Sequence, residues 1–186
     1  MDAKQEFIEL FYTYIRRDGA ESLMNWLENK SDFFTAPASA KFHLACEGGL
    51  ATHSLSVAKL MLRYEDEDKE SLAICGLLHD LCKTNYYKVS MRNVKNDVTG
   101  QWEKQPFYQV EDSFPFGHGE KSVYMIERFF KLSGPEAMAI RWHMGGFDEA
   151  VKGGSFAISK AYERYPLAVK LHLCDMESSY LLEPRG

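Results

Sequence analysis

The chain has 186 residues, of which 45% are hydrophobic and 26% charged, so one globular domain is expected and a disordered or disulfide-stapled chain is excluded. The formal net charge of −5 disfavours an extended nucleic-acid surface, which needs many exposed Lys and Arg residues. No apolar stretch is long enough to span a membrane and the N-terminus has no apolar signal core, so we expect a cytoplasmic protein without membrane attachment.

The first 30 residues predict two short helices separated by Asp18-Gly19. Apolar residues recur at helical spacing in both halves: Phe7, Leu10, Phe11, Leu23, Trp26 and Leu27. We expect residues 1–32 to form a helical extension that packs on a main domain of residues 33–186. Residues 31–49 indicate a loop-rich connection that leads from the N-terminal helices to the next helix.

Two further helices are expected over residues 50–64 and 70–83, and each carries a histidine on its apolar face. His53 lies in the first of these helices. His79 shares the inward stripe of the second with Cys75 and Cys82. The four cysteines form no CxxC pair, which argues against a zinc ribbon and a thioredoxin motif. Because Cys75 and Cys82 lie among apolar residues, we interpret them as reduced core residues.

A β-hairpin is expected over residues 86–110, because two segments rich in Val, Tyr, Phe and Trp flank the turn sequence NDVTG. Pro106 marks an edge or irregular strand. Exposed aromatic residues on this hairpin would suit a cover over a pocket. A hairpin that makes no contact with substrate is the other interpretation, and the sequence leaves both open.

The remaining chain is again helical in pattern. We expect helices over residues 118–132 and 137–144, the second after a capping box formed by Ser133 and Glu136. A short helical link over residues 153–165 precedes a last helix that begins at Pro166 and ends at Leu182. The predicted fold class is therefore all-α, a helical bundle with a small β-hairpin insertion.

Histidines and carboxylates gather on or at the ends of these expected helices. Asp80 and Asp175 lie inside otherwise apolar runs, where a carboxylate is unfavourable unless it is paired, hydrogen-bonded or bound to metal. Imidazole and carboxylate groups in the core of a helical bundle suit Fe, Mn, Co, Ni or Zn. The histidines in question are His53, His79, His118 and His143.

The pattern H…HD…D, formed by His53, His79-Asp80 and Asp175, resembles the HD superfamily of metal-dependent phosphohydrolases. With His118 and His143 the pattern is similar to the branch of that superfamily that binds two metals. The segments FFTAPASAKFH and GGLATHSLSV resemble the start of the HD domain in certain bacterial 3′→5′ exoribonucleases, in which an OB fold comes first. The sequence shows no OB fold, and the resemblance covers about residues 33–182.

This resemblance implies a role for each ligand. Asp80 would bridge two divalent transition-metal ions, because a carboxylate has two oxygens, and a hydroxide shared by the ions would attack phosphorus. The first ion would be held by His53, His79, Asp80 and Asp175, and the second by Asp80, His118 and His143.

Several basic residues are candidates for contact with substrate. Lys83 lies about one helical turn after Asp80, so we expect it to bind phosphate or to assist the leaving group, with a solvated lysine as the alternative. Lys121 is in a helix start whose free amides favour phosphate. Arg141 sits near His143, where it could equally form a surface salt bridge, and His43 lies in the loop before the first ligand helix.

The function predicted from these residues is hydrolysis of a nucleotide or another small phosphomonoester or phosphodiester. Two alternatives remain open at this point. One is an HD-type mixed-valent di-iron oxygenase that cleaves C–C or C–P bonds with O₂, and the other is a noncatalytic metal-containing domain that binds nucleotides as a sensor. Exposed aromatic residues on the hairpin and the N-terminal helices also predict a homodimer contact.

Overall fold

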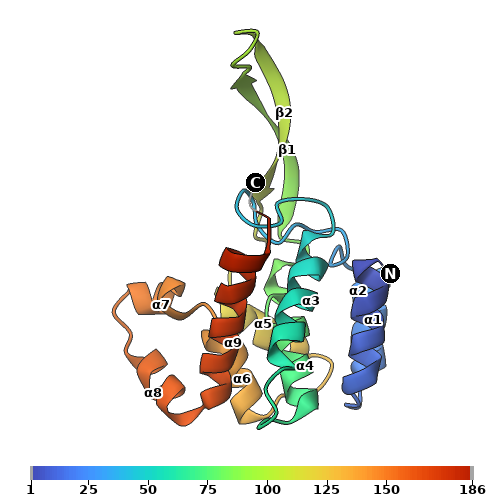
Figure 1. Ribbon diagram of the computed structural model, residues 1–186, viewed down its shortest axis with the longest axis vertical. Helices are drawn as coiled ribbons and strands as arrows, with labels where there is room; N and C mark the ends of the chain where they lie inside the picture. The colour runs from blue at the N-terminus through green and yellow to red at the C-terminus, as the bar shows by residue number, and fades with distance from the viewer. Residues whose placement is uncertain (1, 185–186) are drawn as a thin grey trace.

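The computed structural model describes residues 2–184, and its first two helices follow the expected pattern (Figure 1). Helix α1 (Ala3–Tyr14) begins after Asp2, whose side chain accepts a hydrogen bond from the Gln5 backbone N–H at 2.8 Å. Helix α2 (Ala20–Asn29) follows a short turn. Apolar side chains of both helices, Phe7 and Leu23 among them, are fully buried in the main hydrophobic core. The prediction of two N-terminal helices is confirmed.

Helices α3 (Gly49–Met61) and α4 (Lys69–Leu78) form the centre of the bundle. They approach so closely that a Cβ at Gly76 would overlap the backbone of Ala58. The expectation that the second helix reaches Lys83 is wrong, because α4 ends at Leu78 and a 3₁₀ turn covers Leu81–Lys83. The His79 ring binds the carbonyl of Gly76 at 2.9 Å, an acceptor that a continuing helix would offer to the N–H of Asp80.

Strands β1 (Tyr87–Lys95) and β2 (Trp102–Val110) form the expected hairpin, with an antiparallel register from Tyr87↔Val110 to Lys95↔Trp102. Figure 1 shows that it projects away from the helices. Pro106 pairs with Met91 and is tolerated because both strands of a two-stranded sheet are edges.

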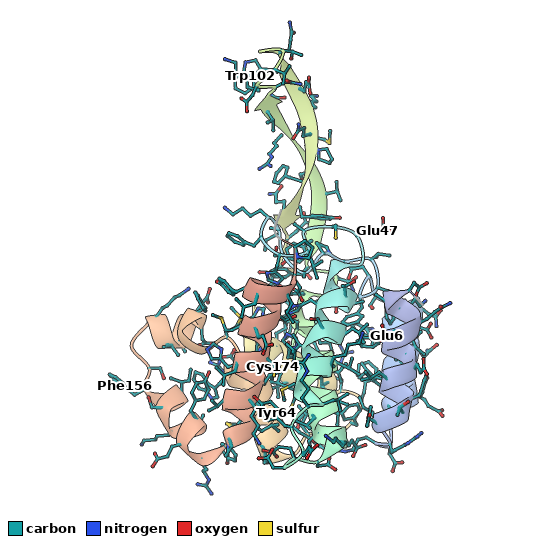
Figure 2. The ribbon with its side chains drawn as sticks, viewed as in Figure 1. Glu6, Glu47, Tyr64, Trp102, Phe156 and Cys174 are labelled. Carbon is teal, nitrogen blue, oxygen red and sulfur yellow. The ribbon has the colours of Figure 1, made fainter. Side chains whose placement is uncertain are left out.

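Aromatic side chains of the hairpin are less exposed than the sequence suggested. Trp102 is 70% exposed and lies near the end of the hairpin farthest from the helices (Figure 2). Four others are half-buried, because they lie nearer the base of the hairpin: Tyr86, Tyr87, Phe107 and Tyr108.

The second half of the bundle contains the elements α5 (His118–Glu127), α6 (Gly134–Trp142), α7 (Glu149–Lys152), α8 (Ala157–Arg164) and α9 (Pro166–Glu177). Ser133 and Glu136 form the predicted capping box at the start of α6. Helix α5 is shorter than expected and ends at Glu127, whereas the last helix continues beyond α9 as a wider π turn over Ser178–Leu182. The helical bundle with a hairpin insertion is thus the observed fold class.

A buried polar cluster joins three parts of the bundle. The Glu136 carboxylate has no exposed surface and accepts hydrogen bonds from Arg17 Nη2, Ser71 Oγ and the Ser133 backbone, each at 2.7 Å. These partners come from the α1–α2 turn, from α4 and from the start of α6. The cluster therefore fixes α6, the helix that presents His143, against the rest of the core.

Among the described residues, no helix combines the length and apolar character that a membrane span requires.

Candidate metal centre

The structure brings the six predicted metal ligands together at one end of the helices that carry them. His53 is in α3, and His79 and Asp80 follow the end of α4. His118 is the first residue of α5, His143 caps the end of α6, and Asp175 is in the last full turn of α9. Because all six lie on or at the ends of helices that share one core, their backbone positions are rigidly fixed.

The Asp80 carboxylate lies in the middle of the histidines. Its Oδ2 atom is 3.5 Å from His53 Nε2 and 3.6 Å from His79 Nε2. Its Oδ1 atom is 2.8 Å from His118 Nε2 and 3.5 Å from His143 Nε2. Each oxygen of this one carboxylate therefore faces a different pair of imidazoles.

Donor atoms that lie within 4.8 Å of one another form several groups that could hold a metal ion. Two groups share His79: one adds His53 and Asp80, and the other adds His143 and Asp175. The sequence-based assignment places His143 beside His118, and their rings are indeed 5.1 Å apart. His143 thus lies between the two expected ion positions. A further group combines Asp80 and His118 with Cys82, and another joins His53 with His43 and Glu183.

Two of the histidine rings are held so that one nitrogen is directed at the centre. His79 Nδ1 donates a hydrogen bond to the carbonyl of Gly76 at 2.9 Å, and His143 Nδ1 donates to the carbonyl of Ile140 at 2.6 Å. Their Nε2 atoms consequently carry the free lone pairs, as in histidines that bind metals. His143 Nε2 is buried and has no hydrogen-bond partner among the described residues. An unpartnered buried acceptor is unfavourable, so this donor set fits a divalent transition-metal ion that would bind it.

His53 is held by a residue that the sequence did not reveal. Its Nδ1 atom lies 2.9 Å from Glu183 Oε1, and the Ser178 hydroxyl donates to the same carboxylate oxygen at 2.6 Å. Glu183 is 130 positions from His53 and follows the π turn that ends the last helix. No motif or periodicity connects the two residues.

Both central carboxylates stay ionised in spite of their burial. Burial raises the pKa of Asp80, but Lys83, His79 and the hydrogen bond from His118 outweigh this effect and hold the pKa well below its usual range. Burial also raises the pKa of Asp175, and the hydrogen bond from His53 reverses the change, so that this pKa is lowered. Both carboxylates are therefore in the ionised form, which is the form that binds a cation.

The imidazoles respond to this negative charge in different ways. Burial lowers the pKa of His53, but hydrogen bonds with two carboxylates raise it to about 9. Burial also lowers the pKa of His118, and a neighbouring thiol and carboxylate raise it to about 10. For His79, burial dominates and lowers the pKa to about 3. His79 is neutral at pH 7, which is the form that binds a metal.

A cavity of about 430 Å³ opens onto this centre. Lys83 is at its wall, where Nζ lies 2.6 Å from Asp80 Oδ2, so the residue is next to the centre as predicted. His43 also lines the cavity, with its ring 5.0 Å from that of His53. His172 is a lining residue too, and its Nδ1 atom donates to the carbonyl of His143 at 2.7 Å. No residue of β1 or β2 lines this cavity, so the hairpin does not cover it.

Two predicted substrate contacts lie away from this cavity. Lys121 Nζ is 2.6 Å from Asp112 Oδ1 and lines a neighbouring cavity of about 510 Å³. Arg141 forms ion pairs with Glu120 and, at 2.7 Å, with Asp148. The structure brings neither cation into the metal centre, and each instead pairs with a carboxylate outside it.

Comparisons with known proteins identify the same part of the chain. The family model described as HD domain matches residues 50–176, which include all six candidate ligands and all but one residue of each of α3 and α9. Neither the search of curated proteins nor the search of solved structures found a match. HD domains are generally metal-dependent hydrolases, in agreement with the cluster of buried imidazoles and carboxylates. From the matched residues and the geometry of the centre, the chain belongs to the HD domain family.

Proposed function

We propose that this protein is a metal-dependent phosphohydrolase that cleaves a nucleotide or another small phosphomonoester or phosphodiester. The observation that carries the proposal is the buried His143 Nε2 atom, which has no hydrogen-bond partner within residues 2–184 and lies 3.5 Å from Asp80 Oδ1. Nitrogen and oxygen atoms arranged in this way are better suited to bind an ion than to form the hydrogen bonds of a closed core.

Asp80 has the central role in this proposal. It would bridge two divalent ions, the first held also by His53, His79 and Asp175, and the second by His118 and His143. When bound, such ions lower the pKa of a water ligand and neutralise charge on a phosphoryl group. The protein contributes the fixed positions of the ligand atoms, which leave the open cavity as the place for the phosphoryl group.

Lys83 is the residue we expect to act directly on the substrate. Burial lowers its pKa, but Asp80 more than offsets this and raises the pKa above its usual value, so Lys83 remains a cation at neutral pH. An ammonium group at the cavity wall would bind a phosphoryl oxygen and stabilise the negative charge that develops during hydrolysis. His43 would contact the substrate from the opposite side of His53.

The cavity supports a nucleotide as the kind of substrate. Its volume of about 430 Å³ is in the usual range for small-molecule sites. Phe42, Phe147 and Tyr180 line it and are each about half or more exposed. Aromatic rings on the wall of a cavity offer surfaces on which a nucleobase can stack.

Elemental analysis of protein purified without chelator, followed by a phosphate-release screen of nucleotides and phosphodiesters, tests this proposal. We expect bound transition metal and turnover in the wild type, loss of both in Asp80→Ala, and retention of metal with loss of turnover in Lys83→Ala. Asp66→Ala, a change at a surface carboxylate with a side chain 71% exposed, is the matched control and should behave like the wild type.

Three outcomes would overturn the proposal or part of it. Full metal occupancy in Asp80→Ala would reject the bridging role. Iron with O₂ uptake and no phosphate release would identify the protein as an oxygenase, and nucleotide binding without turnover would identify a sensor.

A further inference from the structure

We infer that Cys82 is a thiolate ligand of the second metal ion, beside Asp80 and His118. The inference rests on the proposed function only in that it takes these two residues as ligands. A cysteine at this position would make the second site softer than the first, which would be held by nitrogen and oxygen atoms alone.

The donor atoms of these three residues lie within 4.8 Å of one another. Cys82 Sγ is 3.5 Å from His118 Nδ1 and 3.6 Å from His118 Nε2. Two ligands of a tetrahedral ion, a sulfur at about 2.3 Å and a nitrogen at about 2.1 Å, are about 3.6 Å apart. The observed separation of Sγ and Nε2 therefore matches the distance between two ligand atoms of one ion.

The backbone fixes Cys82 in this position. The residue lies in the 3₁₀ turn that directly follows Asp80, and its N–H donates to Ser122 Oγ in α5 at 3.0 Å. Because His118 begins the same helix, this bond holds the Cys82 thiol beside the His118 imidazole. The Cys82 side chain is 3% exposed, but it lines the neighbouring cavity of about 510 Å³, which gives an ion a path to the sulfur.

A second observation points independently to an ion at this place. In the described part of the chain, His143 Nε2 is buried without a hydrogen-bond partner, and it lies 3.5 Å from Asp80 Oδ1, the oxygen that also faces His118. An ion bound to Asp80, Cys82 and His118 would be within reach of this lone pair. The buried thiol of Cys75, by contrast, lies in the apolar core and belongs to none of the ligand groups among the described residues.

Thiolate ligation has a definite chemical consequence. On binding, the thiol would release its proton to solvent and the sulfur would donate its electron pair to the ion, with no change in oxidation state. Thiolate ligands favour Zn, Fe and Co over Mg, Ca and Mn. We therefore expect the second site to discriminate against hard cations.

Cobalt substitution of the full-length protein tests the inference through absorption spectroscopy. A thiolate bound to Co²⁺ gives an intense sulfur-to-metal charge-transfer band in the near ultraviolet, and we expect this band in the wild type. The band should persist in the control Cys75→Ser and disappear in Cys82→Ser, while elemental analysis still finds cobalt in the latter. An unchanged band in Cys82→Ser would overturn the inference.

Zinc-edge X-ray absorption of the wild type provides a measurement that needs no variant to fold. We expect a sulfur scatterer at about 2.3 Å. Bound metal with neither a sulfur scatterer nor a charge-transfer band would overturn the Cys82 inference and leave the proposed function standing. Failure of the wild type to bind any metal would overturn both.

Discussion

The histidines of the metal centre are oriented by hydrogen bonds that involve the ring nitrogen facing away from it. Backbone carbonyls hold His79 and His143 in place, whereas His53 depends on the Glu183 side chain at 2.9 Å. A backbone acceptor cannot be removed by substitution, but this carboxylate can. The orientation of His53 is therefore the point at which the centre is most easily disturbed.

We expect Glu183→Ala to weaken metal binding by about 10–100-fold, because loss of a hydrogen-bond partner loosens the ligand and lowers its basicity. Competitive titration with a chromophoric chelator measures the affinity. Glu177→Ala, at a glutamate whose side chain is 44% exposed, is the control and should leave the metal affinity unchanged. Equal affinities of Glu183→Ala and the wild type would show that Glu183 does not position His53.

The buried Glu136 carboxylate should make the free energy of unfolding depend on pH. Burial raises its pKa, but hydrogen bonds from Ser71, Ser133 and Arg17 lower it below 4.5. A group with a lowered folded-state pKa stabilises the protein above its unfolded-state pKa, and this contribution is lost as pH falls through the folded value. We expect Glu136→Gln to reduce the free energy of unfolding by about 1–3 kcal/mol at pH 7.

Urea unfolding at several pH values checks this prediction. The gap between Glu136→Gln and the wild type should narrow as the pH falls below the unfolded-state pKa of 4.5 toward the lowered folded-state pKa, because the carboxylate of the unfolded chain takes up its proton first. A gap that stays constant down to pH 3 would contradict an ionised Glu136.

The six residues of the centre could be proposed from the sequence because they lie on or at the ends of expected helices and because their order resembles that of the HD superfamily. The sequence did not predict Glu183, which follows the last helix and has no periodic partner. It also offered Lys121 and Arg141 as candidates for contact with substrate, and for Arg141 it left a salt bridge open as the alternative. Asp112, Glu120 and Asp148 neutralise these two cations through tertiary contacts that no local pattern encodes.

At the level of secondary-structure elements, the contact between α3 and α4 determines how close His53 comes to His79. Gly76 allows this contact, because a side chain there would overlap the Ala58 backbone. The Nε2 atoms of the two histidines are 3.2 Å apart. Separation of the helices would therefore widen the site itself.

We expect Gly76→Ala to destabilise the protein by about 1–3 kcal/mol or more, because the added methyl group forces the helices apart. Thermal or urea unfolding measures the effect, and metal content should fall in parallel. Gly134→Ala at the start of α6 is the control, since a Cβ there meets no other atom within 4 Å. Equal stabilities of the two variants would contradict close packing at Gly76.

Helix periodicity predicted which segments are helical, but it located their ends less well. The apolar stripe of α4 continues through His79 and Cys82, so the pattern extended the helix to Lys83. The structure ends it at Leu78, where the His79 ring takes a backbone acceptor. This interruption moves Asp80 and Cys82 off the regular helix and toward the centre, and only the tertiary structure shows it.

In the whole molecule, the hairpin stands apart from the part of the helical bundle that forms the metal centre. The outer half of the hairpin projects away from the bundle, and no residue of β1 or β2 lines the cavity at the metal centre (Figure 1). The sequence could not decide between a cover and a projecting arm, because the direction of a hairpin depends on its base and not on its strand pattern.

Replacement of residues 95–102 by Asn-Gly should shorten the hairpin and leave the bundle intact. We expect an unchanged thermal midpoint and unchanged metal content, since the removed residues are mostly exposed and distant from the centre. Differential scanning calorimetry and elemental analysis provide the two values. Loss of metal on shortening would show that the outer hairpin supports the centre.

Anomalous-difference X-ray diffraction at the absorption edge of the bound metal tests the whole account most directly. We predict one peak within bonding distance of His53, His79, Asp80 and Asp175, and a second peak shared by Asp80, His118 and His143. Crystals of metal-loaded protein with no anomalous peak at Asp80 would contradict the account.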